Sequence, residues 1–140
     1  MVLPHDAKNM KLKRPMSPHL TVYGPTLPAM TSILQRITGT MVTMYALGMA
    51  SVALFVPKGV TGLVEYIQSW DFPSVLIIGV KTIIASSFAF HYLFGIRFTG
   101  FNLGKFLEMK TAYSTAYVCI ALSIVGGVAG GLIGHVYSFM

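Results

Sequence analysis

Three long apolar stretches alternate with short polar segments along the chain, at about residues 29–56, 74–98 and 112–137. Each stretch holds the roughly 20 apolar residues that a helix needs to cross a hydrocarbon core of about 30 Å. Inside lipid the backbone must satisfy its own hydrogen bonds, and no strong period-two alternation indicates a β-barrel. The pattern therefore predicts an all-α membrane protein with three transmembrane helices.

The first 28 residues do not fit this pattern. Residues 14–28, RPMSPHLTVYGPTLP, contain four prolines and Gly24, so they cannot form one helix. Residues 1–13 match a transit peptide poorly, because they lack Arg and Ser and contain Asp6. We expect residues 1–28 to form an irregular surface arm before a three-helix transmembrane domain at residues 29–140.

Composition narrows the class of protein further. The chain has 140 residues, 54% hydrophobic and 10% charged, and its mean hydropathy is +0.70. These values are typical of a membrane protein. The net charge of +6 does not indicate nucleic-acid binding, because the basic residues flank apolar spans. Cys119 is the sole cysteine, so it can form no internal disulfide.

Flanking charges predict the orientation of the spans. The segment through Arg36 carries five basic residues against Asp6, whereas the first loop carries Lys58 against two acidic residues. The second loop, to which we assign Arg97, is again net positive. The N-terminus and the second loop should therefore share the positive side, the cytoplasm or mitochondrial matrix.

Glycines are concentrated in the third stretch, within GGVAGGLIGH at residues 126–135. Gly126, Gly130 and Gly134 recur every four residues, with Gly127 and Gly131 beside them. Such a stripe of small residues lets another helix approach closely. It predicts packing among the three spans or docking of a partner subunit's helix, and both can hold on different faces.

Polar groups inside a span are costly and need a reason. Lys81 lies near enough to a span end for its ammonium group to reach the interface. Arg36 lies about two turns into the first span, with Ser32 one turn earlier on the same face and Gln35 beside it. This group of side chains can hold an anionic propionate, a quinone carbonyl or a lipid phosphate.

His91 lies within the apolar segment FAFHYLFGIR, residues 88–97. It is either a hydrogen-bonded packing residue or an axial ligand of haem iron, which neutral imidazole binds well. Ser87 and Gly95, one turn before and after it, are small and share its face, which leaves room for a flat macrocycle. The other histidines are poorly placed for the same iron, so bis-histidine ligation requires a second subunit.

Three blocks of sequence together resemble a known family. RPMSPHLTVY, then SILQRITG, then HYLFGIR followed by NLGK are similar in order and spacing to the large cytochrome b anchor subunits of succinate dehydrogenase, respiratory complex II. The resemblance covers residues 14 to the end. No single block would suffice, but the three together on a three-span chain are specific.

This resemblance implies a function in succinate:ubiquinone oxidoreductase. The chain would anchor the flavoprotein and iron–sulfur subunits, and it would have no catalytic residue of its own. Electrons from succinate would pass through FAD and iron–sulfur clusters on those partners to ubiquinone. His91 matches the axial ligand of haem b, whose second ligand comes from the small anchor subunit. Ser32 and Arg36 match the quinone pocket, and Arg36 can also reach a haem propionate.

The same resemblance implies a location and two departures from the family pattern. The long RPMSPHLTVY arm favours the mitochondrial inner membrane, with the N-terminus in the matrix, over a bacterial plasma membrane. The family commonly has histidine where this chain has Gln35, and often another where it has Phe98. Gln cannot shuttle protons at neutral pH, so propionate binding and proton delivery should differ here.

Two other functions remain open from the sequence. The same architecture can run in reverse as a quinol:fumarate reductase. Alternatively, the chain is a purely structural anchor without haem, in which His91 is a packing residue and Arg36 binds membrane lipid.

Overall fold

The computed structural model describes residues 4–15 and 17–136, and side chains up to residue 133. The described residues are helical or irregular, without a strand. Three helices are long and apolar enough to cross a membrane: α2 (Leu27–Phe55), α4 (Ser74–Asn102) and most of α5 (Met109–Val136). The predicted all-α class with three spans is confirmed.

Local signals explain where the spans begin and end. α2 begins two residues before the predicted position and carries Pro28 in its first turn, where its missing N–H costs nothing. α4 follows Pro73 and runs four residues beyond the predicted end. It stops at Gly104, where φ is +72°. The Lys105 N–H donates to the Gly100 carbonyl and the Gly104 N–H to the Phe101 carbonyl, at 2.9 Å each, which is a Schellman cap. The predicted end of the third span, residue 137, lies outside the described residues.

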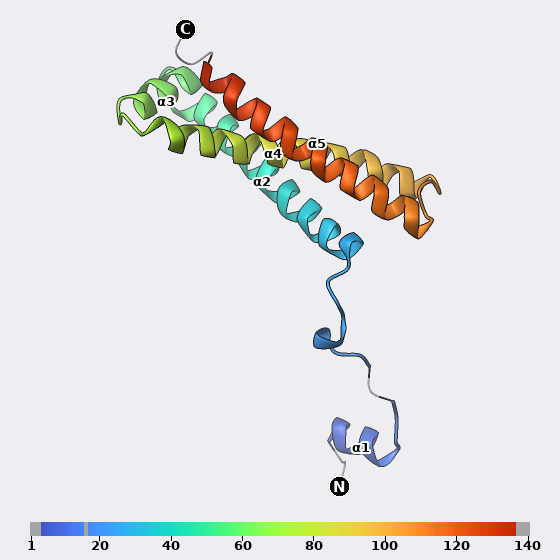
Figure 1. Ribbon diagram of the computed structural model, residues 1–140. Coiled ribbons are helices and arrows are strands. Elements are labelled where there is room, and N and C mark those ends of the chain that lie inside the picture. Colours follow the sequence, from blue (N-terminus) through green and yellow to red (C-terminus); the bar gives the residue numbers. More distant parts are fainter. Residues whose placement is uncertain (1–3, 16, 137–140) are drawn as a thin grey trace.

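A shorter helix, α3 (Gly59–Gln68), occupies the loop between the first two spans. The sequence analysis predicted no helix there. Lys58 and Gly59 both have positive φ, 64° and 59°, and reverse the chain after α2. Figure 1 shows α3 at the end of the bundle away from the N-terminal arm, near the end of α5.

α4 and α5 form a close antiparallel hairpin, and α2 crosses against α4 (Figure 1). Gly127 and Gly131 are buried where α5 meets α4. A methyl group on either glycine would overlap the hydroxyl of Ser86 or Thr82, respectively. Gly130 also faces α4, because a Cβ there would lie 2.9 Å from the Cβ of Ala85. The glycine stripe thus packs α5 on α4 within this chain, while docking of a partner helix stays a prediction.

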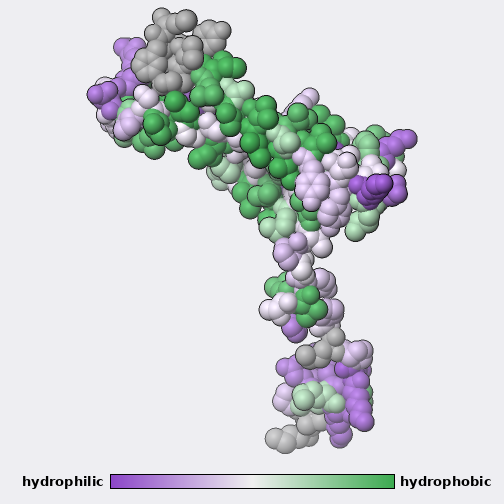
Figure 2. All heavy atoms as spheres, in the orientation of Figure 1, coloured by the Kyte–Doolittle hydropathy of each residue, from purple (hydrophilic) through white to green (hydrophobic). Residues whose placement is uncertain are grey.

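The apolar interior of the bundle is small. Among the described residues, the buried hydrophobic side chains are Phe94, Ala112 and Ala116. Most other large apolar side chains are exposed along the outer faces of the spans. Figure 2 shows this hydrophobic surface over the bundle, with hydrophilic residues gathered on α1 and near the ends of the bundle. The arrangement suits a molecule whose outer surface faces lipid or other apolar partners.

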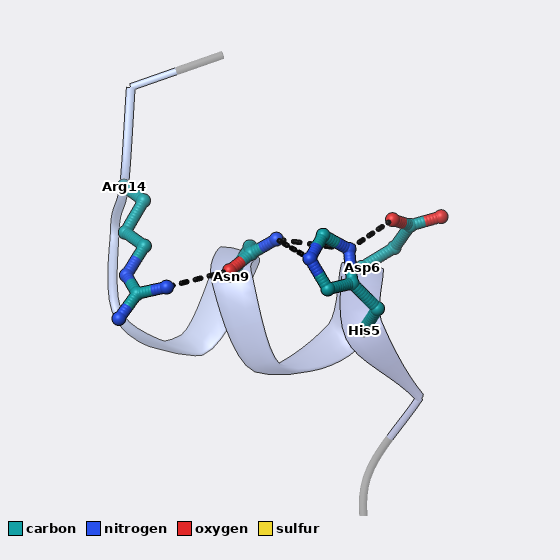
Figure 3. A network of polar contacts seen from close by, with 4 residues as sticks. All are labelled: His5, Asp6, Asn9 and Arg14. Atoms are coloured by element: carbon teal, nitrogen blue, oxygen red, sulfur yellow. Dashed lines mark hydrogen bonds and ion pairs between the residues drawn. The ribbon is translucent and has the colours of Figure 1, made fainter.

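The N-terminal arm projects away from the bundle (Figure 1). It contains α1 (His5–Lys11) and a 3₁₀ turn at Leu20–Val22, both fully outside the core. Figure 3 shows the polar contacts that hold α1: Asn9 bonds the ring of His5 and accepts a 3.2 Å hydrogen bond from Arg14. Residues 14–28 do not form one helix, as predicted: among the described residues of this range, 17–26 are irregular apart from the 3₁₀ turn, and residues 27 and 28 begin α2. The arm's position on a membrane surface stays a prediction.

Candidate functional site

His91 lies where α4 meets α2. Its Nδ1 is 3.2 Å from the backbone carbonyl oxygen of Gln35, so Nδ1 carries the proton and donates it. The Gln35 amide nitrogen returns a 3.1 Å hydrogen bond to the backbone carbonyl of His91. These reciprocal bonds orient the imidazole, and with Nδ1 as the donor a neutral ring would carry its lone pair on Nε2. A backbone carbonyl bonded to Nδ1 is the usual support of a metal-ligating histidine.

The His91 side chain is half-buried, and the hydrogen bond of its ring uses Nδ1 rather than Nε2. Among the described side chains, Gln35 Oε1 is the buried oxygen or nitrogen without a hydrogen-bond partner. Nε2 also makes no hydrogen bond in this part of the chain, so it is not sealed inside the protein. The donor chemistry therefore fits an axial haem ligand: an imidazole oriented through Nδ1, with no hydrogen bond at Nε2 among the described residues.

Gly39 allows this close approach of α2 to the imidazole. A Cβ at Gly39 would lie 2.8 Å from Cε1 of His91, which is closer than packed carbon atoms come. The sequence analysis did not single out Gly39. Its position one turn after Gln35 is a usable signal, because the two residues share a helix face.

Ser87 and Gly95 share the His91 face of α4, as their spacing predicts, and this face lies against α2. Ser87 is buried, and its hydroxyl donates to the Ile83 carbonyl at 2.8 Å and contacts the Met41 sulfur at 3.8 Å. A Cβ at Gly95 would lie 3.8 Å from the amide nitrogen of Gln35. The room predicted around this histidine is thus partly occupied by α2, and Nε2 itself lies near that helix, since a Cβ at Gly39 would come within 3.7 Å of it.

Ser32 and Arg36 lie one turn apart on α2. Ser32 is half-buried and Arg36 is exposed. The Arg36 guanidinium makes no ion pair or side-chain hydrogen bond within the described part of the chain. The three side chains that the sequence analysis grouped therefore do not form one site. Gln35 turns toward α4, whereas Arg36 points outward.

Arg97 is the main polar feature that the sequence analysis misplaced. It was assigned to the second loop, but it lies inside α4 and is 4% exposed. Its Nη2 donates to the Ala112 carbonyl at 2.7 Å, and its Nε donates to the Thr115 hydroxyl at 3.1 Å. The guanidinium also lies 4.4 Å from the centre of the Phe101 ring. Arg97 therefore joins α4 to α5. Without it, Lys105 and Lys110 against Glu108 still leave a net charge of +1 at this end of the two helices.

Phe98, the other departure from the family pattern, packs on the same end of α4. Its ring lies 5.8 Å from that of Phe101 in an edge-on arrangement. The side chain is half-buried among these aromatic groups and offers no hydrogen bond to a ligand.

Comparison with known proteins identifies the family. The profile described as the succinate dehydrogenase/fumarate reductase transmembrane subunit matches residues 10–130. The chain belongs to this family. The resemblance found in the sequence is thereby confirmed, and the three spans described above are those of a succinate dehydrogenase cytochrome b membrane subunit.

Individual relatives agree. The chain is 37% identical over 121 residues to the mitochondrial succinate dehydrogenase cytochrome b560 subunit of Caenorhabditis briggsae, covering 84% of this chain and 65% of that protein. It is 33% identical to the mitochondrial cytochrome B subunit of Schizosaccharomyces pombe, covering 84% and 67%, respectively. Identity to the human b560 subunit is 30%, covering 84% and 70%. The chain thus spans about two thirds of the length of these relatives.

Proposed function

We propose that this chain is the large cytochrome b anchor of a succinate:ubiquinone oxidoreductase in the mitochondrial inner membrane. Family membership and the mitochondrial relatives support the subunit and its location. The chain would hold the flavoprotein and iron–sulfur subunits on the membrane together with a small anchor subunit. FAD and the iron–sulfur clusters would belong to those partners.

The His91 geometry carries the proposal of a haem site. The Nδ1–H bond to the Gln35 carbonyl orients the ring and would leave the Nε2 lone pair to the iron. The second axial ligand would come from the small anchor subunit. When bound, haem b supplies a one-electron redox centre inside the membrane. Burial of the macrocycle between two subunits would offset the cost of placing an imidazole in an apolar span.

Gln35 stands where the family commonly has a histidine, and this changes the hydrogen bonding beside His91. Its Oε1 is buried without a hydrogen-bond partner, while its amide nitrogen is engaged by the His91 carbonyl. An unpaired buried acceptor is destabilising, so the proposed site would be improved by a donor beside Oε1. A water molecule or a protonated propionate near Gln35 would supply it.

Arg36 and Ser32 support the proposal of a quinone site. An exposed guanidinium on a membrane span needs an oxygen-rich partner, and the described chain provides none to Arg36. A quinone carbonyl satisfies this need. Arg36 would donate to the carbonyl oxygen and stabilise the negative charge that develops on it, while the Ser32 hydroxyl donates a second bond. Reduction to the quinol takes two electrons from the partner clusters and two protons from water or a neighbouring subunit.

One spectrum tests the haem proposal. In the assembled complex, the dithionite-reduced minus oxidised spectrum should show a low-spin b-type signal. We expect His91→Ala to abolish it, since the iron loses an axial ligand, and His19→Ala in the exposed arm to leave it unchanged. A wild-type complex without the signal, or a His91→Ala complex that retains it, would show that the chain is a structural anchor with a packing histidine.

Kinetics of one substitution test the quinone proposal. Arg36→Ala should lower succinate:quinone reductase activity by about 10-fold or more, because a donor to the developing charge is lost. Succinate oxidation with an artificial acceptor should remain within about 2-fold of wild type, since that reaction needs only the partner subunits. Equal loss of both activities would contradict the proposal and indicate failed assembly.

The names of the relatives support one direction of the reaction. The family description includes fumarate reductases, but the curated relatives named above are succinate dehydrogenase subunits. We therefore favour succinate oxidation over the reverse reaction.

A further inference from the structure

The segment at residues 59–72, here called the interfacial segment, joins the first two spans on the side away from the arm. It contains α3 and the turn that leads to α4. Three residues separate α3 from the end of α2 at Phe55, and Phe72 lies two residues before Ser74, where α4 begins. At 10 residues, α3 is about 15 Å long and cannot cross a bilayer. The chain therefore holds this segment at the boundary of the two spans.

Exposed aromatic side chains line the end of this segment. The rings of Tyr66 and Trp70 lie 5.1 Å apart, and those of Trp70 and Phe72 lie 5.4 Å apart, in edge-on contacts. Trp70 is 54% exposed and Tyr66 is 59% exposed. The three rings thus form a connected row that the described chain does not cover. Tyr and Trp are the residues enriched where a bilayer meets water.

α3 itself is amphipathic. Val60, Val64 and Ile67 recur at i, i+4 and i+7, so they share one face, and each remains more than a third exposed. Lys58 and Glu65 form an exposed ion pair at 3.1 Å. A helix with an exposed apolar face and charged groups elsewhere is the form that lies along a membrane interface.

From these observations we propose that the interfacial segment lies in the headgroup layer of a phospholipid bilayer, anchored there by the aromatic row in which Trp70 is the middle ring. The apolar face of α3 continues the lipid-facing surface of the spans to which it is joined. Its occupant is therefore the bilayer rather than another protein.

This contact has a consequence for the whole bundle. At 29 residues each, α2 and α4 are about 44 Å long, whereas the hydrocarbon core is about 30 Å thick. Helix length alone does not fix their depth, since extra length is taken up by tilt or displacement. An aromatic row held at one interface would fix the depth of both helices, and with it the depth of His91 and Arg36.

The fluorescence of Trp70 tests the proposal directly, because it is the only tryptophan in the chain. The full chain is reconstituted in phosphatidylcholine vesicles whose acyl chains carry bromine at shallow, middle or deep positions. We expect the shallow bromines to quench Trp70 at least about 2-fold more strongly than the deep ones. Aqueous acrylamide should quench it weakly compared with free tryptophan.

A matched variant calibrates the depth scale. In Trp70→Phe, Ile83→Trp places the reporter on an exposed position near the middle of α4, where the deep bromines should quench best. Strongest quenching of wild-type Trp70 by the deep bromines would overturn the proposal. Full quenching by acrylamide with no quenching by any bromolipid would also overturn it, since the segment would then lie in water.

A second measurement separates lipid from protein. A benzophenone amino acid in place of Trp70 is activated by light in the assembled complex within native membranes. Phospholipid adducts on this chain are expected. Adducts confined to another subunit would overturn the proposal and identify a protein interface at this segment.

Discussion

At the scale of single residues, the contact of Gly39 with His91 is the most sensitive feature of the candidate site. Gly39→Ala would place a methyl carbon 2.8 Å from Cε1 of the imidazole. The ring or the helix must then move, at a cost of about 1–3 kcal/mol. We expect a shifted or weakened b-type spectrum and a changed haem midpoint potential in the assembled complex.

Gly48→Ala on the same helix is the matched control, because nothing lies within 4 Å of its added Cβ. It should leave the spectrum and the potential as in wild type. If Gly39→Ala also left both unchanged, the imidazole would not be held by α2 in the complex.

Arg97 leads to a second residue-scale prediction. Its partners, the Ala112 carbonyl and the Thr115 hydroxyl, have other hydrogen bonds or helical neighbours, so removing the charge leaves few unpaired groups. Arg97→Met keeps most of the buried volume and should change stability by about 1 kcal/mol or less. Arg97→Ala opens a cavity and should cost about 2–4 kcal/mol. Thermal unfolding of the full chain in detergent measures both. Equal destabilisation would show that the charge itself is required.

At the scale of helices, the hairpin of α4 and α5 depends on two glycines. Gly127→Ala or Gly131→Ala would place a methyl group against Ser86 or Thr82 and separate the helices. We expect each to lower the free energy of unfolding by about 1–3 kcal/mol. Gly79→Ala in α4 meets nothing within 4 Å and should be neutral or slightly stabilising. Thermal unfolding distinguishes them, and equal melting temperatures would contradict close packing at these positions.

The spans could be predicted from the sequence because twenty apolar residues in lipid have few alternatives to a helix. Their ends were predicted to within a few residues, and the largest error was at α4. There the FTGFN segment contains no proline, the helix continues through Gly100, and the cap at Gly104 ends it. α3 was missed because Lys58, Glu65 and Asp71 marked the whole connection as a charged loop, although the ten residues of α3 itself include only one charged side chain, Glu65. α3 lies between two spans in the sequence and packs against α2. Such a contact with another helix cannot be predicted from the local sequence pattern.

Contacts between helices were the least predictable part of the site. The spacing within α4 correctly put Ser87, His91 and Gly95 on one face. It could not show that Gln35 would face His91 while Arg36 points outward, because a helix sequence gives the angles of side chains but not the neighbour they meet. Arg97 was misplaced for the same reason, since a cation near a span end normally extends to the interface.

At the scale of the whole molecule, the flanking charges predict a fixed orientation. On a Cys119→Ser background, Ser17→Cys in the arm and Ser69→Cys beside α3 are both exposed. In mitoplasts, an impermeant maleimide should label Ser69→Cys at once and Ser17→Cys only after the membrane is permeabilised. The reverse pattern would contradict the matrix location of the N-terminus, and labelling of both before permeabilisation would contradict a membrane crossing by α2, the span that separates them.

The small apolar interior described above bears on how cells handle this chain. The buried apolar side chains of the described part are Phe94, Ala112 and Ala116. Packing of large apolar side chains within this chain therefore contributes little to its stability. In the proposed complex, contacts with lipid and with the partner subunits would supply further stabilisation after insertion. Newly made copies would therefore compete for a limited supply of assembly partners, and surplus copies would be exposed to membrane proteases. The steady-state amount of the chain should follow the synthesis of its partners more closely than that of its own messenger RNA.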